Sequence, residues 1–272
     1  MGFDGPLPTI SSTPTNMTIP ELVDPIQATK VAIEQVWSIS GIAKRLNVDE
    51  TTLRKNLYHR AYIPDLLDPT KDTFLPQIGG TTIYIFGNYN ARTPDTKIAA
   101  RIHDECNGSD CFGTDICTCR PYLVYAIKEL NEFAKQGNLG IFIYNRKEGR
   151  SLGEVSKFMA YNTRKRQPGG DCKEKYFDAT VRVASIRDAR IQKLMPDPLL
   201  WLGIDKIDVW YSMSNEKSSA IRDVGIEIVE QQEIPMEDIP EAAMIEITAK
   251  IDDGYYAKDL SADAGANAGG GR

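Results

Sequence analysis

The segment 106–119, CNGSDCFGTDICTC, holds four of the chain's five cysteines and constrains the fold more than any other stretch. Such crowding has three ordinary causes: a disulfide framework, a bound metal, or a reactive thiol. Residues 1–20 lack the basic and apolar regions of a secretory signal, so we expect a cytoplasmic protein. Stable disulfides are rare in that compartment, and five is an odd number. The sequence therefore favours a metal site or catalytic cysteines.

The charge balance argues against two classes of partner. The 272 residues carry a formal net charge of −6. Non-specific binding to nucleic acid or to an anionic membrane needs a positive field, which this balance disfavours. The sequence also contains no apolar run approaching the roughly 18 residues needed to span a bilayer. We therefore expect no DNA, RNA or membrane partner, while a local basic pocket for phosphate is compatible with this charge.

Both ends of the chain have a composition that does not favour a packed core. Residues 1–25 are rich in proline, serine and threonine, which predicts a flexible arm. Residues 251–272 end in SADAGANAGGGR, which predicts a flexible tail. Between them we expect a helical segment over 26–76 and a catalytic domain over 77–250.

The helical segment imitates a DNA-binding motif. SISGIAKRLNVDETTLRKNLYHR reads as a helix through Leu46, a turn at Asn47 and a second helix capped by Asp49 or Thr51. Few basic residues accompany it, and the whole chain is acidic. We therefore expect two packed helices rather than a DNA-reading pair.

The middle of the chain alternates between strand and helix patterns, which is typical of an α/β or α+β domain. β-Branched and aromatic residues bounded by Gly, Asn and Pro predict strands, and apolar residues at helical spacing predict helices. The predicted strands are 79–89, 98–106, 139–144, 207–211 and 225–230, and the predicted helices are 121–136, 152–165 and 214–223.

The spacing of Cys106, Cys117 and Cys119 suits a zinc site with one open position. A strand end can supply the first thiolate and a tight loop the other two. Three thiolates and a water complete a tetrahedron, and zinc lowers the pKa of such a water to roughly 7. Two alternatives remain open on spacing alone: unliganded buried thiols, or a closed structural site completed by Cys111.

The motifs RIHDEC, DICTC, YNRKEGR and KFMAY together resemble GTP cyclohydrolase II, a zinc enzyme that opens the imidazole ring of GTP. They occur over roughly residues 79–235, in the family's order and at nearly its spacing. The resemblance implies a GTP cyclohydrolase II-like mixed sheet with flanking helices, and a homodimer. It also implies one zinc ion on the three cysteines, and nucleotide contacts from Arg101, His103, Asp104, Glu105, Glu148, Gly149 and Arg150.

Three further catalytic residues are implied by the same resemblance. Tyr161 matches a family tyrosine, and Asp188 and Arg190 match the family's Asp-x-Arg pair. In the family the aspartate is assigned as proton acceptor and the arginine as nucleophile toward the α-phosphorus. A carboxylate can move protons, and a guanidinium fits phosphate oxygens with two parallel hydrogen bonds. Taken alone, the pair would read as solvated helix residues.

The departures from the family pattern fall where the base and phosphates are read. The family's RCDCG-x-Q is ICTCRPY here, so Tyr122 replaces a glutamine that helps to hold guanine. The family's TNNP-x-K is SMSNEK here, with Ser212 and Lys217 as the plausible counterparts. The three cysteines are unchanged, so zinc chemistry is still expected. The residues that recognise guanine in the family are altered, so specificity for guanine is not expected to carry over.

The altered motifs resemble a branch of the superfamily that is linked to uracil catabolism and to ring opening of a uridine nucleotide. Our leading hypothesis is a zinc-dependent hydrolase in which an activated water adds to a uracil carbonyl of UMP. Tyr161 and Glu148 would steady the base, Asp188 would transfer the proton, and Arg101, Arg150 and Lys217 would hold phosphate. The alternatives are an authentic GTP cyclohydrolase II and a nucleotide-binding regulator without catalysis. Mg²⁺ is a possible second ion.

Overall fold

The computed structural model describes residues 9–17, 19–22, 24–34, 36–61, 67–70, 74–76 and 80–258. The strands are β1 (Thr9–Met17), β2 (Ile26–Glu34), β3 (Val36–Ser38), β4 (Phe74–Pro76), β5 (Thr81–Phe86), β6 (Ile98–Asp104), β7 (Leu139–Asn145), β8 (Lys206–Tyr211) and β9 (Glu227–Gln232). The α-helices are α1 (Ile39–Leu46), α2 (Glu50–Ala61), α3 (Asn107–Asp110), α4 (Cys119–Lys135), α5 (Glu154–Lys165), α6 (Tyr176–Ala184), α7 (Asp197–Trp201), α8 (Asn215–Asp223) and α9 (Met244–Asp252). Short 3-10 turns connect several of them.

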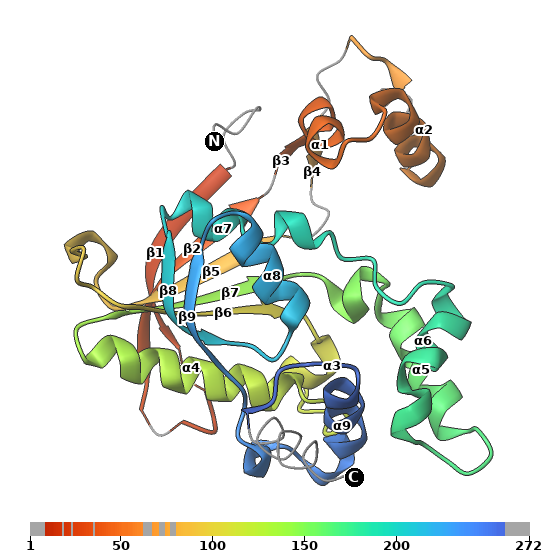
Figure 1. Cartoon of the computed structure of the whole chain (residues 1–272). Coiled ribbons are helices and arrows are strands. Elements are labelled where there is room, and N and C mark those ends of the chain that lie inside the picture. The colour runs from red at the N-terminus through yellow and green to blue at the C-terminus, as the bar shows by residue number, and fades with distance from the viewer. Residues whose placement is uncertain are drawn as a thin grey trace, which may run out of the picture. The chain divides into compact units, whose positions relative to one another are not determined.

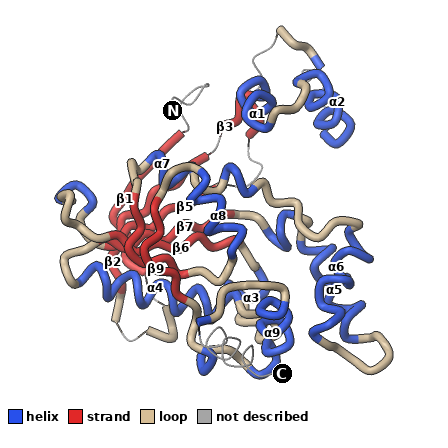
Figure 2. Tube along the Cα trace, viewed as in Figure 1, coloured by secondary structure: helices blue, strands red, loops and turns tan. Residues whose placement is uncertain are grey.

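A seven-stranded sheet forms the centre of the fold and confirms the predicted α/β class (Figures 1 and 2). Its strand order is β1-β2-β5-β7-β6-β8-β9. Strand β6 pairs in parallel with both β7 and β8, and β8 pairs in parallel with β9. Because parallel strands end at the same edge of a sheet, the residues that follow β6, β7 and β8 are brought together there.

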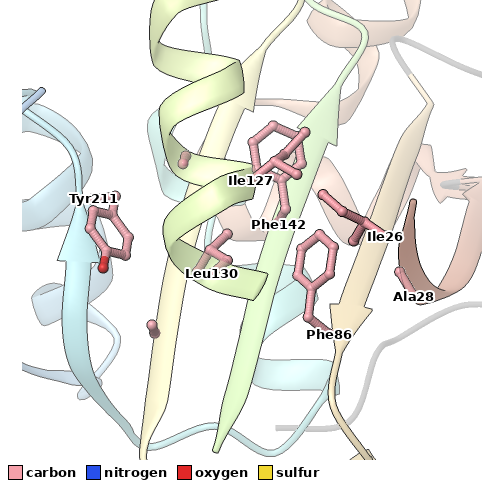
Figure 3. Packing of buried hydrophobic residues seen from close by; sticks show 9 residues of the cluster. Ile26, Ala28, Phe86, Ile127, Leu130, Phe142 and Tyr211 are labelled. Atoms are coloured by element: carbon pink, nitrogen blue, oxygen red, sulfur yellow. The ribbon is translucent and has the colours of Figure 1, made fainter. Parts of the chain in front are cut away.

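The helix predicted over 121–136 is confirmed as α4, which packs against β6 and β7 (Figure 3). Ile127 and Leu130 of α4 are buried beside Phe142 of β7 in one apolar cluster. The contact depends on Gly140, because a Cβ atom there would lie 2.4 Å from the backbone oxygen of Leu130. Helix and strand therefore approach more closely than a side chain at that position would allow.

By its internal contacts the chain divides into two compact units, 1–13 with 31–82 and 14–30 with 83–272. In the first unit, α1 and α2 follow the predicted helix-turn-helix outline. Asp49 accepts a hydrogen bond of 2.7 Å from the backbone N–H of Thr52, which is the expected N-cap. Arg54 is only 4% exposed and pairs with Glu50 at 2.7 Å, so this basic side chain is used within the helix pair.

Three segments differ from the sequence-based expectation. Residues 26–34, expected to be helical, form strand β2, in which Ile26 and Ala28 are buried on either side of exposed Gln27. Residues 9–17, expected in a flexible arm, form β1, because backbone hydrogen bonding in a sheet does not require an apolar composition.

The third difference lies at the C-terminal end. Residues 251–258, expected in a flexible tail, continue from α9, and Ile251 and Tyr255 pack against the buried cluster around Tyr122 and Ile247. The backbone N–H of Tyr256 also donates to the oxygen of Met213 at 2.8 Å. The predicted tail residues 259–272 and arm residues 1–8 lie outside the described part of the chain.

Within the described residues, no helix combines the length and apolar character that crossing a bilayer requires.

Candidate active site around a cysteine triad

A cavity of about 210 Å³ opens where the parallel strands β6, β7 and β8 end. Side chains from the strand ends and from α4, α5, α6, α8 and α9 line it. All residues that the sequence analysis assigned to the site line this cavity except Glu148 and Asp188. The segments Arg101–Cys106, Gly149–Arg150 and Ser212–Lys217 are thereby brought together from distant positions in the chain.

The three cysteines assigned to zinc converge on one wall of the cavity. Cys106 follows β6, Cys117 lies in the turn before α4, and Cys119 begins α4. Their sulfur atoms all lie within 4.8 Å of one another. A tetrahedral zinc ion with Zn–S bonds of about 2.3 Å needs sulfur atoms roughly 3.8 Å apart, so the triad fits that ion. Cys111 is exposed and does not belong to the group.

Lys157 of α5 is a site residue that the sequence analysis did not identify. Its Nζ lies 2.6 Å from the sulfur of Cys106 and 2.8 Å from a carboxylate oxygen of Glu148. Hydrogen bonds from Cys117 and Cys119, together with the Lys157 charge, lower the pKa of Cys106 well below its ordinary value. The signal in the sequence was its spacing, since Lys157 stands one helical turn before Tyr161 and shares its face.

Glu148 is not among the residues that line the cavity, but it links parts of the cavity wall. One oxygen accepts from the backbone N–H of Asn107 at 2.6 Å, and the other accepts from Gly149 and Lys157. Gly149 has a φ of 59°, a left-handed conformation that glycine adopts without strain. Both carboxylate oxygens of Glu148 thus have hydrogen-bond partners in the wall, and its predicted contact with a base stays a prediction.

Asp110, also missed by the sequence analysis, supports Cys106 from behind. Its carboxylate is 3.1 Å from His103 Nε2 and accepts hydrogen bonds of 2.9 Å from the Cys106 backbone N–H and the Tyr144 hydroxyl. The His103 ring stacks with the rings of Phe142 and Tyr144, and its burial lowers its pKa. His103 thus contributes to the wall as a neutral ring.

An ion cluster lies beside the triad. Asp104 pairs with Arg190 at 2.8 Å and with Lys217 at 2.9 Å, while Arg190 also binds Asp188 through two nitrogens. Burial alone would raise the pKa of Asp104, but the charges of Lys217 and Arg190 lower it far below its ordinary value. Burial lowers the pKa of Lys217 to about 8. Asp188 itself does not line the cavity, but it is bonded to Arg190, which does.

The remaining predicted residues form the cationic and aromatic walls. Arg101 is 9% exposed, donates to the Tyr211 backbone oxygen at 2.8 Å and stacks on the Tyr122 ring at 4.3 Å. Arg150 donates to the Tyr255 hydroxyl at 3.3 Å. Burial raises the pKa of Tyr122 to about 12 and raises that of Tyr161 still further. Both phenols are thus neutral hydrogen-bonding groups near neutral pH.

Two more predicted residues, Ser212 and Glu105, have simpler surroundings. The Ser212 hydroxyl accepts from the backbone N–H of Ser214 at 3.1 Å. Burial and the nearby Glu148 charge raise the pKa of Glu105. Within the described residues, buried polar atoms of the cavity wall that lack a hydrogen-bond partner include Arg101 Nε and His103 Nδ1. Leaving a buried polar atom without a hydrogen-bond partner is costly. Such atoms are therefore expected where a polar ligand binds.

Comparison with known proteins finds two matching family models. The sequence model of GTP cyclohydrolase II matches residues 78–233, and that of the GTP cyclohydrolase N-terminal region matches 17–60. A Lachancea kluyveri protein, URC1, provisionally named as a GTP cyclohydrolase, is 51% identical over 85% of this chain and 52% of its own length. Uracil-regulated protein 1 of Schizosaccharomyces pombe is 50% identical over 86% of this chain and 54% of its own length.

More distant relatives have a different name. GTP cyclohydrolase-2 of Haemophilus influenzae is 31% identical over 50% of this chain and 58% of its own length. The chain spans about half the length of the Lachancea kluyveri and Schizosaccharomyces pombe relatives. The family match covers more than half of the chain and includes the triad and the ion cluster, while the part of the cavity wall from α9 lies beyond it. The resemblance inferred from the motifs is thus confirmed, and the chain belongs to the GTP cyclohydrolase II family.

Proposed function

We propose that this chain is a zinc-dependent hydrolase that opens the pyrimidine ring of a uridine nucleotide, UMP. The observation that carries the proposal is the sequence identity of 51% and 50% to the two fungal relatives, one of which is named for its regulation by uracil. The residues that replace the family's base-reading motif support it, since Tyr122 and Thr118 both line the cavity.

The residues present suit a zinc ion at the triad. Thiolates are preferred zinc ligands, and three of them leave a fourth position for water. When bound, zinc would supply a water activated for attack on a ring carbonyl at neutral pH. Mg²⁺, which binds through phosphate oxygens, is a candidate second ion that would arrive with the nucleotide.

The protein side chains have separate roles in this proposal. Tyr161 and Tyr122, both neutral, offer hydrogen bonds and flat surfaces to the base. Arg101, Arg150 and Lys217 line the cavity as the cations that bind phosphate. Asp188 moves the proton, and Arg190 orients its carboxylate through the hydrogen bonds that join them. Glu148 steadies the base together with Tyr161 and also holds Lys157 at the triad.

The test compares two substrates. The zinc-loaded chain is incubated with UMP and, separately, with GTP, and the products are separated by chromatography. We expect consumption of UMP without release of phosphate. The second candidate, GTP cyclohydrolase II, is favoured by the family match and would release formate and pyrophosphate from GTP. Nucleotide binding without turnover would instead support the regulatory alternative.

We further propose that the chain forms a homodimer through the outer face of α5 and α6. Val155 and Met159 of α5 are 74% and 52% exposed and stand one helical turn apart, and Val181 of α6 is 42% exposed. Light scattering after size exclusion tests this. Val155→Glu should yield monomers, whereas Val229→Glu, at an exposed position of β9, should not. A monomeric unsubstituted chain would contradict the proposal.

A further inference from the structure

The wall of the cavity that α9 contributes contains a buried carboxylate whose hydrogen bonding is incomplete. Glu246 is only 4% exposed. Its Oε1 accepts a hydrogen bond of 3.0 Å from the Thr118 hydroxyl and pairs with Lys250 one helical turn further on. Its Oε2 is buried and has no hydrogen-bond partner. Glu246 also lies beyond residues 78–233, so the family match does not cover it.

The three residues of this group all line the same cavity as the cysteine triad. Thr118 stands between Cys117 and Cys119, so its hydrogen bond attaches Glu246 to the loop that carries two of the sulfur atoms. Lys250 in turn donates to the Thr118 hydroxyl at 3.2 Å. The carboxylate is thus linked through Thr118 to the segment that carries Cys117 and Cys119.

The unpaired oxygen determines what chemistry can complete the site. An ionised carboxylate oxygen only accepts hydrogen bonds, and leaving it buried and unpaired is costly. The ion pair with Lys250 satisfies Oε1 alone. It does not explain why Oε2 is buried without a hydrogen-bond donor. Lys250 donates to Glu246 and Thr118, and its ammonium carries a third N–H. The pair therefore presents an acceptor beside a donor.

The walls around this pair are flat. Tyr161 and Tyr176 both line the cavity, and the Arg164 guanidinium lies 5.4 Å from one ring centre and 4.1 Å from the other. Arg164 is itself paired with Asp171 at 2.7 Å. Aromatic faces suit a planar ring, and the acceptor-donor pair suits the polar edge of that ring.

We propose that Glu246 is a specificity-determining residue that accepts a hydrogen bond from a ring N–H of the substrate base, with Lys250 donating to the adjacent ring carbonyl. The inference rests on the proposed function for the identity of the base. Uracil offers an N–H between two carbonyl groups, which matches the pair. Cytosine offers a bare ring nitrogen at the same position, and its lone pair would face the carboxylate.

The experiment measures binding rather than turnover. Dissociation constants of UMP and CMP are determined by calorimetry on the zinc-loaded full chain in an Asp188→Asn background, which slows ring opening. Hydrogen bonds to a charged group contribute enough to make UMP bind at least about tenfold more tightly than CMP. Glu246→Gln, whose amide can turn its N–H toward cytosine, should reduce this ratio by about tenfold. Glu241→Gln, at an exposed residue before α9, should leave it unchanged.

An unchanged ratio in a Glu246→Gln protein that retains zinc would show a structural residue and overturn the inference. Should that variant fail to fold, UMP labelled with ¹⁵N on its imide nitrogen gives a second readout in the background protein. The imide proton should then be protected from exchange with water and shifted downfield. A freely exchanging imide proton in the bound nucleotide would also overturn the inference.

Failure of the proposed function can be distinguished from failure of this inference. If GTP binds and UMP does not, the proposed substrate is wrong, and the comparison is repeated with GTP and 1-methyl-GTP, which lacks the ring N–H. If GTP binds about tenfold more tightly than 1-methyl-GTP and Glu246→Gln removes this difference, the role of Glu246 is retained. Equal binding of the two purine nucleotides would overturn it, and binding of no nucleotide would overturn both proposals.

Discussion

At the scale of single residues, the sequence predicted the side chains that belong to recognisable motifs and missed those that support them. Cys106 was predicted from its spacing, whereas Asp110, which accepts from its backbone N–H, carries no motif of its own. Lys157 contacts Cys106, and Glu246 contacts Thr118, only after α5 and α9 have packed. Helical spacing was the one signal for Lys157, and Glu246 had none, so residues outside the motifs were missed.

The metal assignment predicts the effect of cysteine substitutions. Cys106→Ser or Cys119→Ser removes one of three sulfur ligands, so each purified variant should lose most of its zinc in elemental analysis. Cys111→Ser and Cys172→Ser are the matched controls and should retain a full equivalent, because neither residue belongs to the triad. Full zinc in both of the first two variants would place the metal elsewhere.

Arg190 should act by positioning Asp188 rather than by attacking phosphorus. Arg190→Lys keeps the charge but cannot maintain the hydrogen bonds to Asp188 and Asp104 together. We expect its kcat for ring opening to fall by less than that of Asp188→Asn, which removes the proton acceptor. Intact-protein mass spectrometry is the control, because a nucleotide adduct on Arg190 would indicate the phosphoryl chemistry of the GTP enzyme.

Lys217 should give nucleotide binding a pH dependence. Burial lowers its pKa to about 8, so the side chain is an ammonium below that pH and loses its proton above it. A neutral Lys217 no longer attracts phosphate, and the KM for UMP should therefore rise as the pH increases through about 8. Lys217→Arg stays charged and should abolish this rise. An identical pH profile in the two proteins would show that another group is responsible.

At the scale of elements, a helix with clear start and stop residues was predicted correctly, whereas a segment with an ambiguous pattern was not. Helix α4 has Pro121 in its first turn and Gly137 just beyond its end, and the structure confirms it. Strand β2 was wrongly predicted as helix, because the short run 26–34 is compatible with both periods. Only its pairing in the sheet, which is a tertiary effect, decides between them.

The close approach of α4 to β7 predicts a specific destabilisation. Gly140→Ala would place a Cβ atom 2.4 Å from the Leu130 backbone oxygen, so helix and strand must separate. We expect a loss of roughly 1–3 kcal/mol in the free energy of unfolding, measured with denaturant. Gly137→Ala meets no neighbouring atom and has only the strain of a φ of 87°, so its loss should be smaller, at about 1 kcal/mol. Equal losses would argue against this contact.

At the scale of the whole molecule, the cavity joins segments from residue 101 to residue 255, although the predicted domain ended at 250. The motifs predicted the strand ends correctly, because parallel strands carry their site at one edge. The contribution of α9 and residues 253–258 could not be predicted, since a polar, glycine-containing stretch gives no sign of the apolar cluster that holds it.

The central claim is that the triad and its cavity hydrolyse a pyrimidine ring. Mass spectrometry of UMP incubated with the zinc-loaded chain in heavy-oxygen water tests it most directly. Opening of one ring C–N bond adds the elements of a single water, so the product should gain one heavy oxygen and keep its phosphate. Zinc removal or Cys106→Ser should prevent the gain. Unchanged UMP, with GTP consumed and formate and pyrophosphate released under the same conditions, would contradict the claim.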